Sequence, residues 1–403
     1  MRYYWDINEA ERASAGGTIR MDAHPTDPTT IQTGRSRSTA APLLGRRALN
    51  RALLARQMLL RRQPASALEA IERLCGLQAQ APGAPYYALW SRLDRFDPAA
   101  LGELLVGRRA VRIALMRATL HLVSARDALA LRPLLQPVQE RGLAGAFGKR
   151  LAGADADAIA ALGREWTAER PLSFAELGAR LAERWPDRDP EALAAAVRAR
   201  VPLAQVPPRG LWGLSGQALH APLDAWTGLP EEPGCTAEAL VVRYLAAFGP
   251  ASVKDMQAWS GLTKLQDAVR RLGPALVRFR DERGAELFDL PDAPRPDADM
   301  PCPARFLGEF DQMLLAYADR SRILSDAHKQ RVFTANGLVR PVFLLDGFVA
   351  GKWEIRRQRD DATLVVEPFA PLSAEGREAL GEEGARLLAF AAEGCRHEIR
   401  FEA

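Results

Sequence analysis

Two glutamines flank a single alanine in the stretch GLQAQAPGAPYY, which covers residues 76 to 87. Amide side chains do not titrate, so Gln78 and Gln80 cannot serve as a general acid and a general base. Each amide instead offers a carbonyl oxygen that accepts hydrogen bonds and an NH₂ group that donates them. The chemistry open to this pair is therefore the positioning of a water molecule or of a polar substrate group.

The residues around the two glutamines favour an extended chain. Gly76 stands where a helix ends, and Pro82 forces the preceding Ala81 out of the helical region. Side chains two residues apart point to the same side of an extended chain, so we expect both amides to face one substrate atom. Taken alone, the motif is more typical of a solvated loop.

Three further polar residues alternate along the stretch RATLH. Arg117, Thr119 and His121 have two interpretations. In the first, they belong to an ordinary strand pair in which His121 is a satisfied core or edge residue. In the second, all three line a cleft beside the glutamines. The segment itself does not decide between these interpretations.

Other basic residues are candidates for DNA contact. Arg209 in PPRG either belongs to a solvated turn or enters a groove and touches phosphate. For Asp311, Arg320 and Arg322 in DQMLLAYADRSR, a structural salt bridge is as plausible as a DNA contact. We keep Arg320 as a candidate DNA contact. Lys352, in a strand-like stretch, is a further candidate.

Cysteine and histidine usage argues against several kinds of site. The four cysteines, Cys75, Cys235, Cys302 and Cys395, are far apart and form no C-x-x-C pair. They indicate neither a zinc site nor a redox motif, and reduced thiols are expected. The five histidines show no metal-ligand spacing. We therefore predict no metal and no cofactor.

The sequence also contains no sign of a membrane protein. No apolar run approaches the roughly 18 residues that a membrane-spanning helix needs. No signal-peptide pattern opens the chain. We expect a cytoplasmic protein with no membrane partner.

Basic residues cluster in one part of the chain. Lysine occurs only five times among 54 basic residues, an arginine excess that a GC-rich genome explains. Codon bias does not explain clustering. Residues 105–150 hold nine basic residues against two acidic ones, Asp127 and Glu140. Such a local basic patch is typical of a phosphate-binding surface and suggests DNA as the partner.

The elements that must position these residues recur along the chain. Ser66 with Glu69, Ser173 with Glu176, and Ser252 with Asp255 each form the pattern of a capping box at a helix start. Three times, a group of helices precedes two short β-prone runs, which is the order of a winged helix. The expected hairpins join 111–117 to 119–123, 203–206 to 211–214, and 276–280 to 286–290.

These patterns predict an α+β fold of three tandem winged-helix modules followed by a small β-barrel-like domain. Trp90, Trp259 and Trp353 are expected in cores. The Asp346–Gly347 pair predicts a hairpin turn in the last domain. The predicted segments are a flexible N-terminal arm (1–45), a first module with the glutamine motif (46–124), a second module with a helical insert (125–232), a third module (233–290) and the β-rich domain (291–403).

Six stretches, in their order and spacing, resemble the winged-helix DNA glycosylases of the AlkZ type. They are LNRALLARQMLLRR, GLQAQ.P..PYYALWSRL, MRATLHLV, FGPASVKDMQAWSGL, FLGEFDQMLLAYADRSRIL and LLDGFVAGKWEI. The resemblance covers residues 46 to 400 and leaves out the arm. It implies that Gln78-Ala79-Gln80 is the active-site Gln-x-Gln pair of the branch linked to self-resistance against DNA-alkylating natural products. It also implies that the three modules form a concave surface cradling duplex DNA.

The same resemblance implies excision of bulky N7-alkylguanine adducts, and in some members the unhooking of interstrand crosslinks. Because an N7-alkylguanine is already cationic, it leaves as a neutral base without a general acid. Gln78 and Gln80 would then hold the hydrolytic water through their carbonyl oxygens while their NH₂ groups anchor to neighbours.

We expect a monofunctional, monomeric enzyme acting on double-stranded DNA that carries alkylated purines. No lysine lies near the motif to form a Schiff base, and the nearest in sequence is Lys149. The alternative is a non-catalytic winged-helix protein that binds DNA or sequesters the drug. A regulator usually needs a dimer and a sequence-reading helix, whereas three modules in one chain favour a monomer.

Overall fold

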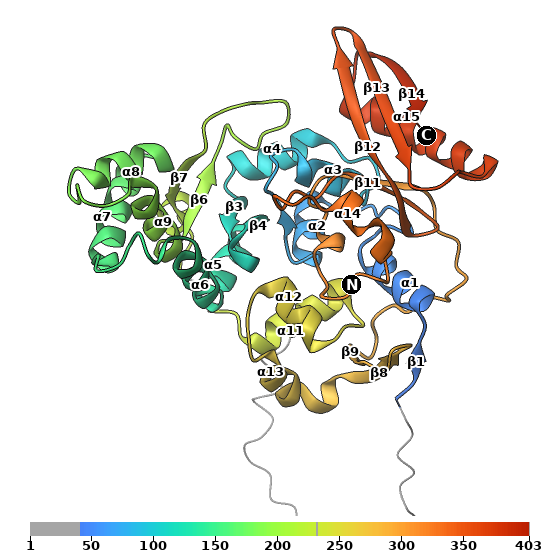
Figure 1. The fold of residues 1–403 in the computed structure, drawn as a ribbon, viewed down its shortest axis with the longest axis horizontal. Helices are drawn as coiled ribbons and strands as arrows, with labels where there is room; N and C mark the ends of the chain where they lie inside the picture. The colour runs from blue at the N-terminus through green and yellow to red at the C-terminus, as the bar shows by residue number, and fades with distance from the viewer. Residues whose placement is uncertain (1–40, 231–232, 403) are drawn as a thin grey trace, which may run out of the picture. The chain divides into compact units, whose positions relative to one another are not determined.

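The structure, a computed structural model, describes residues 41–230 and 233–402. The predicted arm, residues 1–45, lies outside the described residues up to residue 40. Helix α1 begins at Arg46, where the first module was expected to start. Figure 1 shows the order of the helices and strands that follow.

The first predicted module holds the glutamine motif between helices. Strand β1 (Leu43–Leu44) precedes it, in the last residues of the predicted arm. The elements of the module are α1 (Arg46–Arg56), α2 (Ala67–Arg73), β2 (Leu77–Gln78), α3 (Ala84–Trp90), α4 (Pro98–Val106), β3 (Ala110–Ala114) and β4 (Leu120–Ser124). The capping box at the start of α2 is confirmed, because Ser66 accepts from the Glu69 N–H and the Glu69 side chain accepts from the Ser66 N–H. Pro85 lies in the first turn of α3, where its missing N–H costs nothing.

The next segments are mainly helical. The second predicted module contains α5 (Ala125–Leu134), α6 (Gln136–Phe147), α7 (Ala156–Glu169), β5 (Leu172–Ser173), α8 (Phe174–Ala182), α9 (Pro190–Arg200), β6 (Leu203–Val206), β7 (Leu219–Pro222) and α10 (Leu223–Thr227). The third contains α11 (Ala237–Phe248), α12 (Val253–Ser260), α13 (Leu265–Leu272), β8 (Val277–Asp281) and β9 (Glu286–Asp289). The capping boxes of α8 and α12 are both confirmed.

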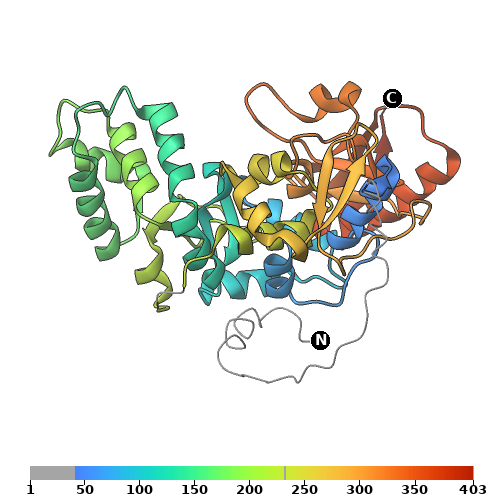
Figure 2. The ribbon, with the colours of Figure 1, turned by 90° about the horizontal axis from the view of Figure 1, so that it is seen from below.

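The hairpins of the first and second predicted modules share one sheet. Its six strands run in the order β2-β4-β3-β6-β7-β5. The link between the two hairpins is the antiparallel pair β3–β6, where Arg112 lies opposite Gln205 and Ile113 opposite Ala204. In both Figure 1 and Figure 2, helices α7, α8 and α9 lie together in the green part of the chain, and they share a buried cluster with β5 and β6. The division into separate winged-helix modules stays a prediction.

The second hairpin does not return where the sequence predicted. Residues 211–214 form no strand, and the return strand is β7, so the connection covers residues 207–218. The reason lies in the aromatic residues of this loop. Trp212 packs against Tyr86 with ring centroids 4.9 Å apart and against Phe390 at 5.0 Å. These ring contacts hold the partly buried indole against α3 and α15.

The third hairpin is confirmed. Strands β8 and β9 pair antiparallel, and β1 adds to β8 in parallel. The largest buried cluster unites residues from all of these regions, among them Leu53, Ile113, Phe248 and Val342. The core therefore runs through the predicted segment boundaries.

The C-terminal sheet is open, and the expected barrel-like domain was wrong. The chain continues through β10 (Arg305–Leu307), α14 (Lys329–Val332), β11 (Val342–Leu345), β12 (Phe348–Gln358), β13 (Asp361–Pro368), α15 (Ala374–Ala391) and β14 (Arg396–Phe401). The strand order is β10-β11-β12-β13-β14, and among the described residues the two edge strands β10 and β14 do not pair. Helix α15 covers the sheet instead and buries Leu380, Leu387 and Leu388.

Details of this sheet follow the sequence closely. The Asp346–Gly347 turn between β11 and β12 is confirmed, and both residues have positive φ, as a two-residue hairpin turn requires. Trp353 is buried and its indole N–H donates to the backbone oxygens of Leu307 and Val342.

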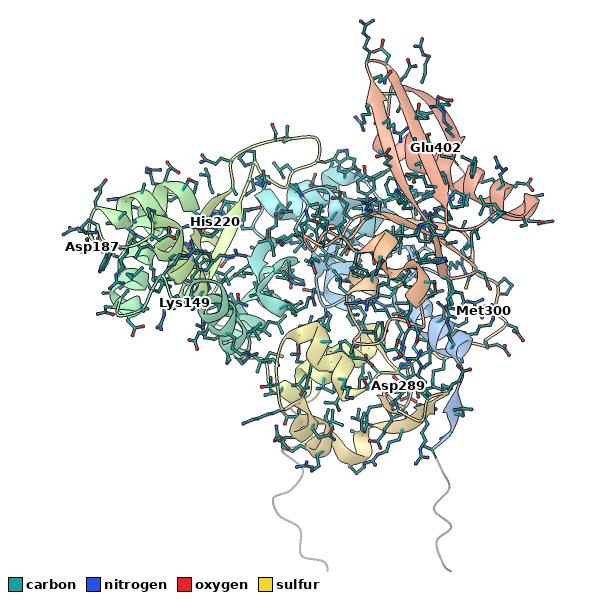
Figure 3. All side chains as sticks on the ribbon, viewed as in Figure 1. Lys149, Asp187, His220, Asp289, Met300 and Glu402 are labelled. Carbon is teal, nitrogen blue, oxygen red and sulfur yellow. The ribbon has the colours of Figure 1, made fainter. Side chains whose placement is uncertain are left out.

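Buried arginines tie the segments together. Arg56 on α1 makes a two-fold ion pair with Asp289 of β9, at 2.6 and 2.8 Å. Arg92 makes an equivalent pair with Asp311, at 2.8 and 2.9 Å, with both side chains fully buried. Asp289 is marked in Figure 3, which shows the dense side-chain packing around it. Much of the arginine content is therefore structural.

Candidate functional site

Gln78 lies in strand β2 and not in a loop. It pairs with His121 across β4, and its side chain is only 7 % exposed. Neighbouring residues of a strand face opposite sides of the sheet. Gln78 therefore shares a face with Ile113 and Ala204, which belong to the largest buried cluster.

Arg117 holds the Gln78 amide. It lies in the tight turn between β3 and β4, where both Arg117 and Ala118 have positive φ. One guanidinium nitrogen donates to Gln78 Oε1 and the other to the backbone oxygen of Trp259 at the end of α12. Burial, together with the nearby charge of Arg320, lowers the pKa of Arg117 to about 10. The group stays a cation at neutral pH and fixes the direction of the Gln78 carbonyl.

Gln80 lies beyond the end of β2 and is exposed. Its Oε1 accepts a hydrogen bond of 3.1 Å from the Leu120 N–H. Because an N–H group and a guanidinium can only donate, these partners settle which end of each amide is the oxygen. Neither Gln78 nor Gln80 donates an amide hydrogen bond to any side chain or backbone group in the described ranges. The arrangement is the reverse of our expectation: the carbonyls anchor the amides, and the NH₂ groups are left for a ligand.

Thr119 and His121 complete the surroundings of Gln78. The His121 ring nitrogen Nδ1 lies 2.9 Å from the Thr119 oxygen, and the Thr119 hydroxyl donates to Met116 O at 3.1 Å. Burial first, and Arg117 second, lower the pKa of His121 to about 3, so the ring is neutral at pH 7. The structure thus brings Arg117, Thr119 and His121 together beside Gln78. Their contact with DNA stays a prediction.

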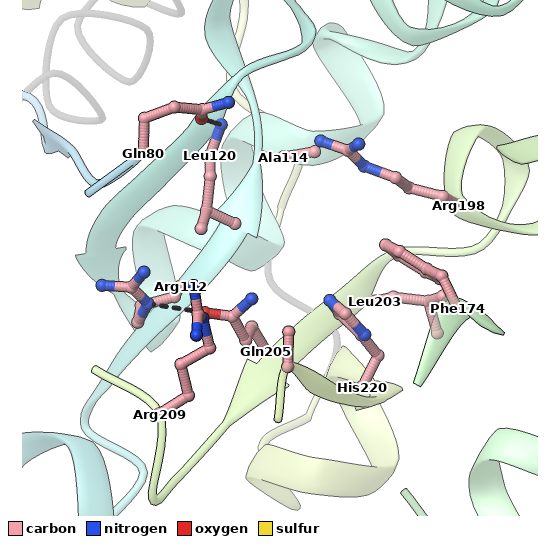
Figure 4. A pocket seen from close by; sticks show the side chains of 11 residues that line it. Gln80, Arg112, Ala114, Leu120, Phe174, Arg198, Leu203, Gln205, Arg209 and His220 are labelled. Atoms are coloured by element: carbon pink, nitrogen blue, oxygen red, sulfur yellow. Dashed lines mark hydrogen bonds between the residues drawn. The ribbon is translucent and has the colours of Figure 1, made fainter. Parts of the chain in front are cut away.

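A pocket of about 210 Å³ opens on the other face of the sheet, next to Gln80 (Figure 4). It is lined by Gln80, Arg112, Ala114, Leu120, Phe174, Arg198, Leu203, Gln205, Arg209, Ala218 and His220. Arg112 anchors its wall by donating to Gln205 Oε1 at 3.0 Å and to Ala79 O at 2.9 Å. The same arginine therefore holds the backbone between the two glutamines.

The two glutamines do not point at one atom, as strand alternation had led us to expect. Gln78 faces the core side with His121, while Gln80 lines the pocket beyond the strand end. The reason is that β2 stops at Gln78, so the alternation does not continue to residue 80. Since β2 is an edge strand of the sheet, a ligand that lies across this edge meets both faces.

The other predicted DNA contacts have partners within the chain. Arg209 lines the pocket and donates to Gly216 O at 3.0 Å. Arg320 donates to Leu314 O at 2.7 Å and stacks over Phe333. Lys352 pairs with Glu367 on the neighbouring strand at 2.7 Å. Arg322 donates to the backbone oxygen of Pro250, a contact within the chain that is not the salt bridge considered above. DNA contacts by Arg209, Arg320 and Lys352 stay predictions.

Most of the basic stretch 105–150 also serves the fold. Arg112, Arg132 and Arg141 each donate to backbone oxygens. Arg150 pairs with Asp189 and Glu191. Arg109 and Lys149 are exposed, and neither has a side-chain partner among the described residues.

Sequence reasoning missed the pocket residues on the second module. Arg198, His220, Gln205 and Phe174 come from α9, β7, β6 and α8, and no motif marks them. What brings these residues together is the pairing of β3 with β6, and no pattern in the sequence marks that pairing. Within the described part of the chain, no group of three or more His, Cys, Asp or Glu side chains is placed to hold a metal ion. In the same part, no helix is both long and apolar enough to span a membrane.

Comparison with known proteins adds independent information. Residues 71–390 match the model of the family described as DNA glycosylase AlkZ-like. The chain is 35 % identical over 152 residues to an interstrand DNA cross-link repair glycosylase of Streptomyces sahachiroi. That alignment covers 36 % of this chain and 39 % of the relative, so the chain spans about two fifths of the relative's length.

The fold is also that of a solved glycosylase. The structure superimposes on Streptomyces sahachiroi DNA glycosylase AlkZ with a TM-score of 0.75 and 23 % identity, covering 89 % of this chain and all of that one. At this identity the match establishes a shared mixed α+β fold. The family match spans most of the chain and includes the Gln-x-Gln edge, the basic pocket and the C-terminal sheet as far as β13. The chain therefore belongs to the AlkZ-like family of DNA glycosylases.

Proposed function

We propose that the protein is a monofunctional DNA glycosylase that hydrolyses the N-glycosidic bond of bulky N7-alkylguanine adducts in duplex DNA. The observation that carries this proposal is the pair of oriented amides at the sheet edge, with free NH₂ groups, in a chain of a glycosylase family. In this reaction the C1′–N9 bond breaks and its electron pair neutralises the cationic base. A water oxygen bonds to C1′ and releases its proton to solvent.

The two glutamines have different parts in this proposal. Gln80 Oε1 has a second lone pair free after accepting from Leu120, so it can accept a hydrogen bond from the attacking water. Gln78 Oε1 already accepts from a cation, which makes it a weaker acceptor for water. Its free NH₂ group donates instead. Gln80 thus positions the water, and Gln78 with Arg117 and His121 shapes the edge against which the sugar lies.

No carboxylate takes part in this proposed step, so the lesion must supply much of its own lability. A cationic base needs no proton before it leaves, which is why bulky N7-alkylguanines fit this site better than neutral bases do. Because the cross-link repair named for the Streptomyces sahachiroi relative breaks the same kind of bond, we extend the proposal to the unhooking of interstrand crosslinks between two alkylated guanines. The biological role would be self-resistance to a genotoxic natural product.

We also propose that the three helix-and-hairpin units are winged-helix modules that cradle duplex DNA, and that the protein acts as a monomer. The repeated order of helices followed by a hairpin supports this organisation. The shared sheet of the first two hairpins fixes their relative position, which a rigid DNA cradle needs.

Incubation with duplex DNA that carries one defined bulky N7-alkylguanine tests the activity. We expect release of the modified base and an alkali-labile abasic site, unchanged by EDTA, with no covalent adduct trapped by borohydride. A duplex crosslinked through two N7-alkylguanines tests unhooking in the same way. If the protein binds these duplexes and releases no base, it is a non-catalytic DNA-binding protein and the proposal fails.

A further inference from the structure

The pocket beside Gln80 contains three guanidinium groups and no carboxylate (Figure 4). Arg112 donates to the neutral acceptors Ala79 O and Gln205 Oε1, and Arg209 donates to Gly216 O. Arg198 has no hydrogen bond or ion pair with any described residue and only lies over the Phe174 ring, at 5.8 Å. The buried arginines Arg56 and Arg92, by contrast, each face an aspartate.

Among the described residues that line the pocket, no carboxylate offsets these charges. Burial, and then the repulsion of Arg209, lower the pKa of Arg112 to about 10, which means that two cations face each other without an anion. Such a cluster costs free energy, and a bound anion would offset that cost.

A buried histidine is a second feature of the pocket that fits an anionic ligand. His220 is 5 % exposed, stacks on Phe174 with ring centroids 3.9 Å apart, and lines the pocket. Its Nδ1 atom is buried, and no group in the described ranges forms a hydrogen bond with it. Buried polar atoms without a partner are rare in proteins. In its Nδ1–H tautomer, a neutral His220 would donate from this atom to an oxyanion in the pocket.

The size of the pocket limits what can enter. Its volume of about 210 Å³ lies below the range of roughly 300–1,000 Å³ that is usual for drug-sized ligands. A bulky alkylated base is therefore too large, whereas a phosphate group fits. Guanidinium groups bind phosphate oxygens with paired, charge-assisted hydrogen bonds.

We propose that this pocket binds one phosphodiester group of the DNA strand that carries the lesion, and thereby sets the position of the sugar against Gln80. This inference rests on the proposed function, which identifies the DNA. It adds a phosphate contact that the proposed reaction does not specify. Gln80 links the two, because it lines the pocket and holds its carbonyl toward the Leu120 N–H at the sheet edge.

Arg198→Gln is the variant that tests the pocket. Arg198 makes no hydrogen bond or ion pair with a described residue, so the variant should unfold at the same urea concentration as the wild type. Arg184→Gln is the matched control, since Arg184 is exposed on the same helical region, outside the pocket, and has no partner among the described residues. A second pocket variant, Arg209→Gln, should behave like Arg198→Gln.

Binding is measured by fluorescence anisotropy with lesion-bearing duplexes in which single phosphates are replaced, one at a time, by neutral methylphosphonates. We expect one position beside the lesion to weaken wild-type binding by roughly tenfold to a hundredfold, the usual range for a charge-assisted contact. Arg198→Gln should bind the unmodified duplex as weakly as the wild type binds that methylphosphonate duplex. The same methylphosphonate should then weaken the binding of Arg198→Gln little further. For Arg184→Gln, the same methylphosphonate should weaken DNA binding by the same factor as it does for the wild type.

Three results would overturn the proposal. One is that no methylphosphonate position distinguishes Arg198→Gln from Arg184→Gln. Another is that Arg198→Gln binds the unmodified duplex as tightly as the wild type does. The third is that inorganic phosphate binds the wild type and not Arg198→Gln while all DNA positions behave alike, which would assign the pocket to a free anion. Base release is followed separately, so a protein that shows the expected coupling but releases no base would refute the proposed activity and leave the phosphate pocket standing.

Discussion

Gln78 and Gln80 carry the same side chain in different environments, and this difference separates their roles. The Gln78 amide is buried and accepts from a guanidinium, whereas the Gln80 amide is exposed and accepts from a backbone N–H. Removing each side chain therefore has different consequences for stability. The pair is informative because only one member can be changed without disturbing the fold.

We expect Gln80→Ala to slow single-turnover base release at least tenfold and to change the free energy of unfolding by less than about 0.5 kcal/mol. The truncated side chain is exposed and leaves no cavity. Gln78→Ala should also slow release, but it should cost about 1–3 kcal/mol of stability, because Arg117 is left with an unpaired, partly buried N–H. Rapid-quench kinetics and urea unfolding give the two quantities.

Gln63→Ala is a suitable control, since the Gln63 amide donates only to the exposed Arg61 backbone oxygen. Gln80→Glu is the sharper chemical probe. A carboxylate can hold the same water and also stabilise the cationic sugar, so this variant should retain activity. Wild-type rates in both alanine variants would remove the glutamines from the mechanism.

Two buried neutral histidines predict a loss of stability in mild acid. Burial lowers the pKa of His121 to about 3 and of His220 to about 4, against 6.5 in the unfolded chain. Below pH 6.5 the unfolded state therefore binds more protons than the folded state, and stability falls as the pH falls. The decrease approaches about 1.4 kcal/mol per pH unit for each histidine until its folded pKa is reached.

Urea midpoints measured at pH 7.0, 6.0 and 5.0 check this expectation, because few carboxylates titrate in that window. His220→Gln should reduce the pH dependence relative to the wild type. A midpoint that stays constant from pH 7 to 5 would show that the two rings are not buried as neutral groups.

At the scale of elements, the end of α12 sets the turn that holds Gln78. Gly261 closes α12 with φ +81°, and a Cβ atom there would lie 2.8 Å from Val138 Cγ1 and 3.2 Å from the Arg117 nitrogen. Gly228 closes α10 with φ +63° and has nothing within 4 Å of such an atom. The two glycines share their backbone conformation and differ in what surrounds them.

We expect Gly228→Ala to lose about 1 kcal/mol through backbone strain alone and to keep its rate of base release. Gly261→Ala has the same backbone strain and also displaces the turn that contains Arg117. This variant should therefore lose more stability than Gly228→Ala and release the base more slowly. Thermal unfolding and single-turnover assays of both variants measure these effects. Equal behaviour of the two variants would show that the turn is not coupled to the site.

Local signals in the sequence predicted local structure well. The Ser–x–x–Glu and Ser–x–x–Asp patterns marked helix starts at α2, α8 and α12, because the capping contacts lie within four residues. The Asp–Gly turn was equally clear. The β3–β6 pair was not, because Arg112 and Gln205 are 93 positions apart and no local pattern encodes which strand edges meet. The pocket depends on that pair and was missed with it.

Aromatic packing explains the misplaced strand. The apolar run of residues 211–214 is typical of a strand, but Trp212 packs against the rings of Tyr86 and Phe390 instead. A similar limit applies to Gln78, whose burial follows from Arg117 reaching across the sheet edge. Family resemblance identified both glutamines, whereas their hydrogen-bond partners required the structure.

At the scale of the whole molecule, net charge overstates the surface available to DNA. The chain has 54 basic residues, but Arg56, Arg92 and Arg112 are among its most deeply buried side chains. The open C-terminal sheet and the long-range ion pairs could not be predicted from composition. The basic side chains that are exposed and available to bind DNA must therefore be identified one by one.

DNA affinity should fall steeply between 50 and 200 mM salt, because binding releases counterions from phosphates. Arg109→Gln should weaken binding to all sequences and reduce the magnitude of the salt slope by about one. Arg132→Gln is the control, since Arg132 is buried and donates to Ala199 O and Gln136. It should leave the slope unchanged. Affinity without salt dependence would contradict binding to the phosphate backbone.

The joined sheet has a consequence for how the chain is made. Strand β3 ends at Ala114, but its partner β6 begins at Leu203, after five helices. A ribosome adding roughly 5–20 residues per second needs on the order of ten seconds to supply that partner. During this interval one side of β3, beside the glutamine strand and its hairpin, presents unpaired backbone groups to the cell. Nascent chains that stop before residue 203 therefore carry an exposed strand edge, and such fragments should aggregate or recruit chaperones where the finished protein does not.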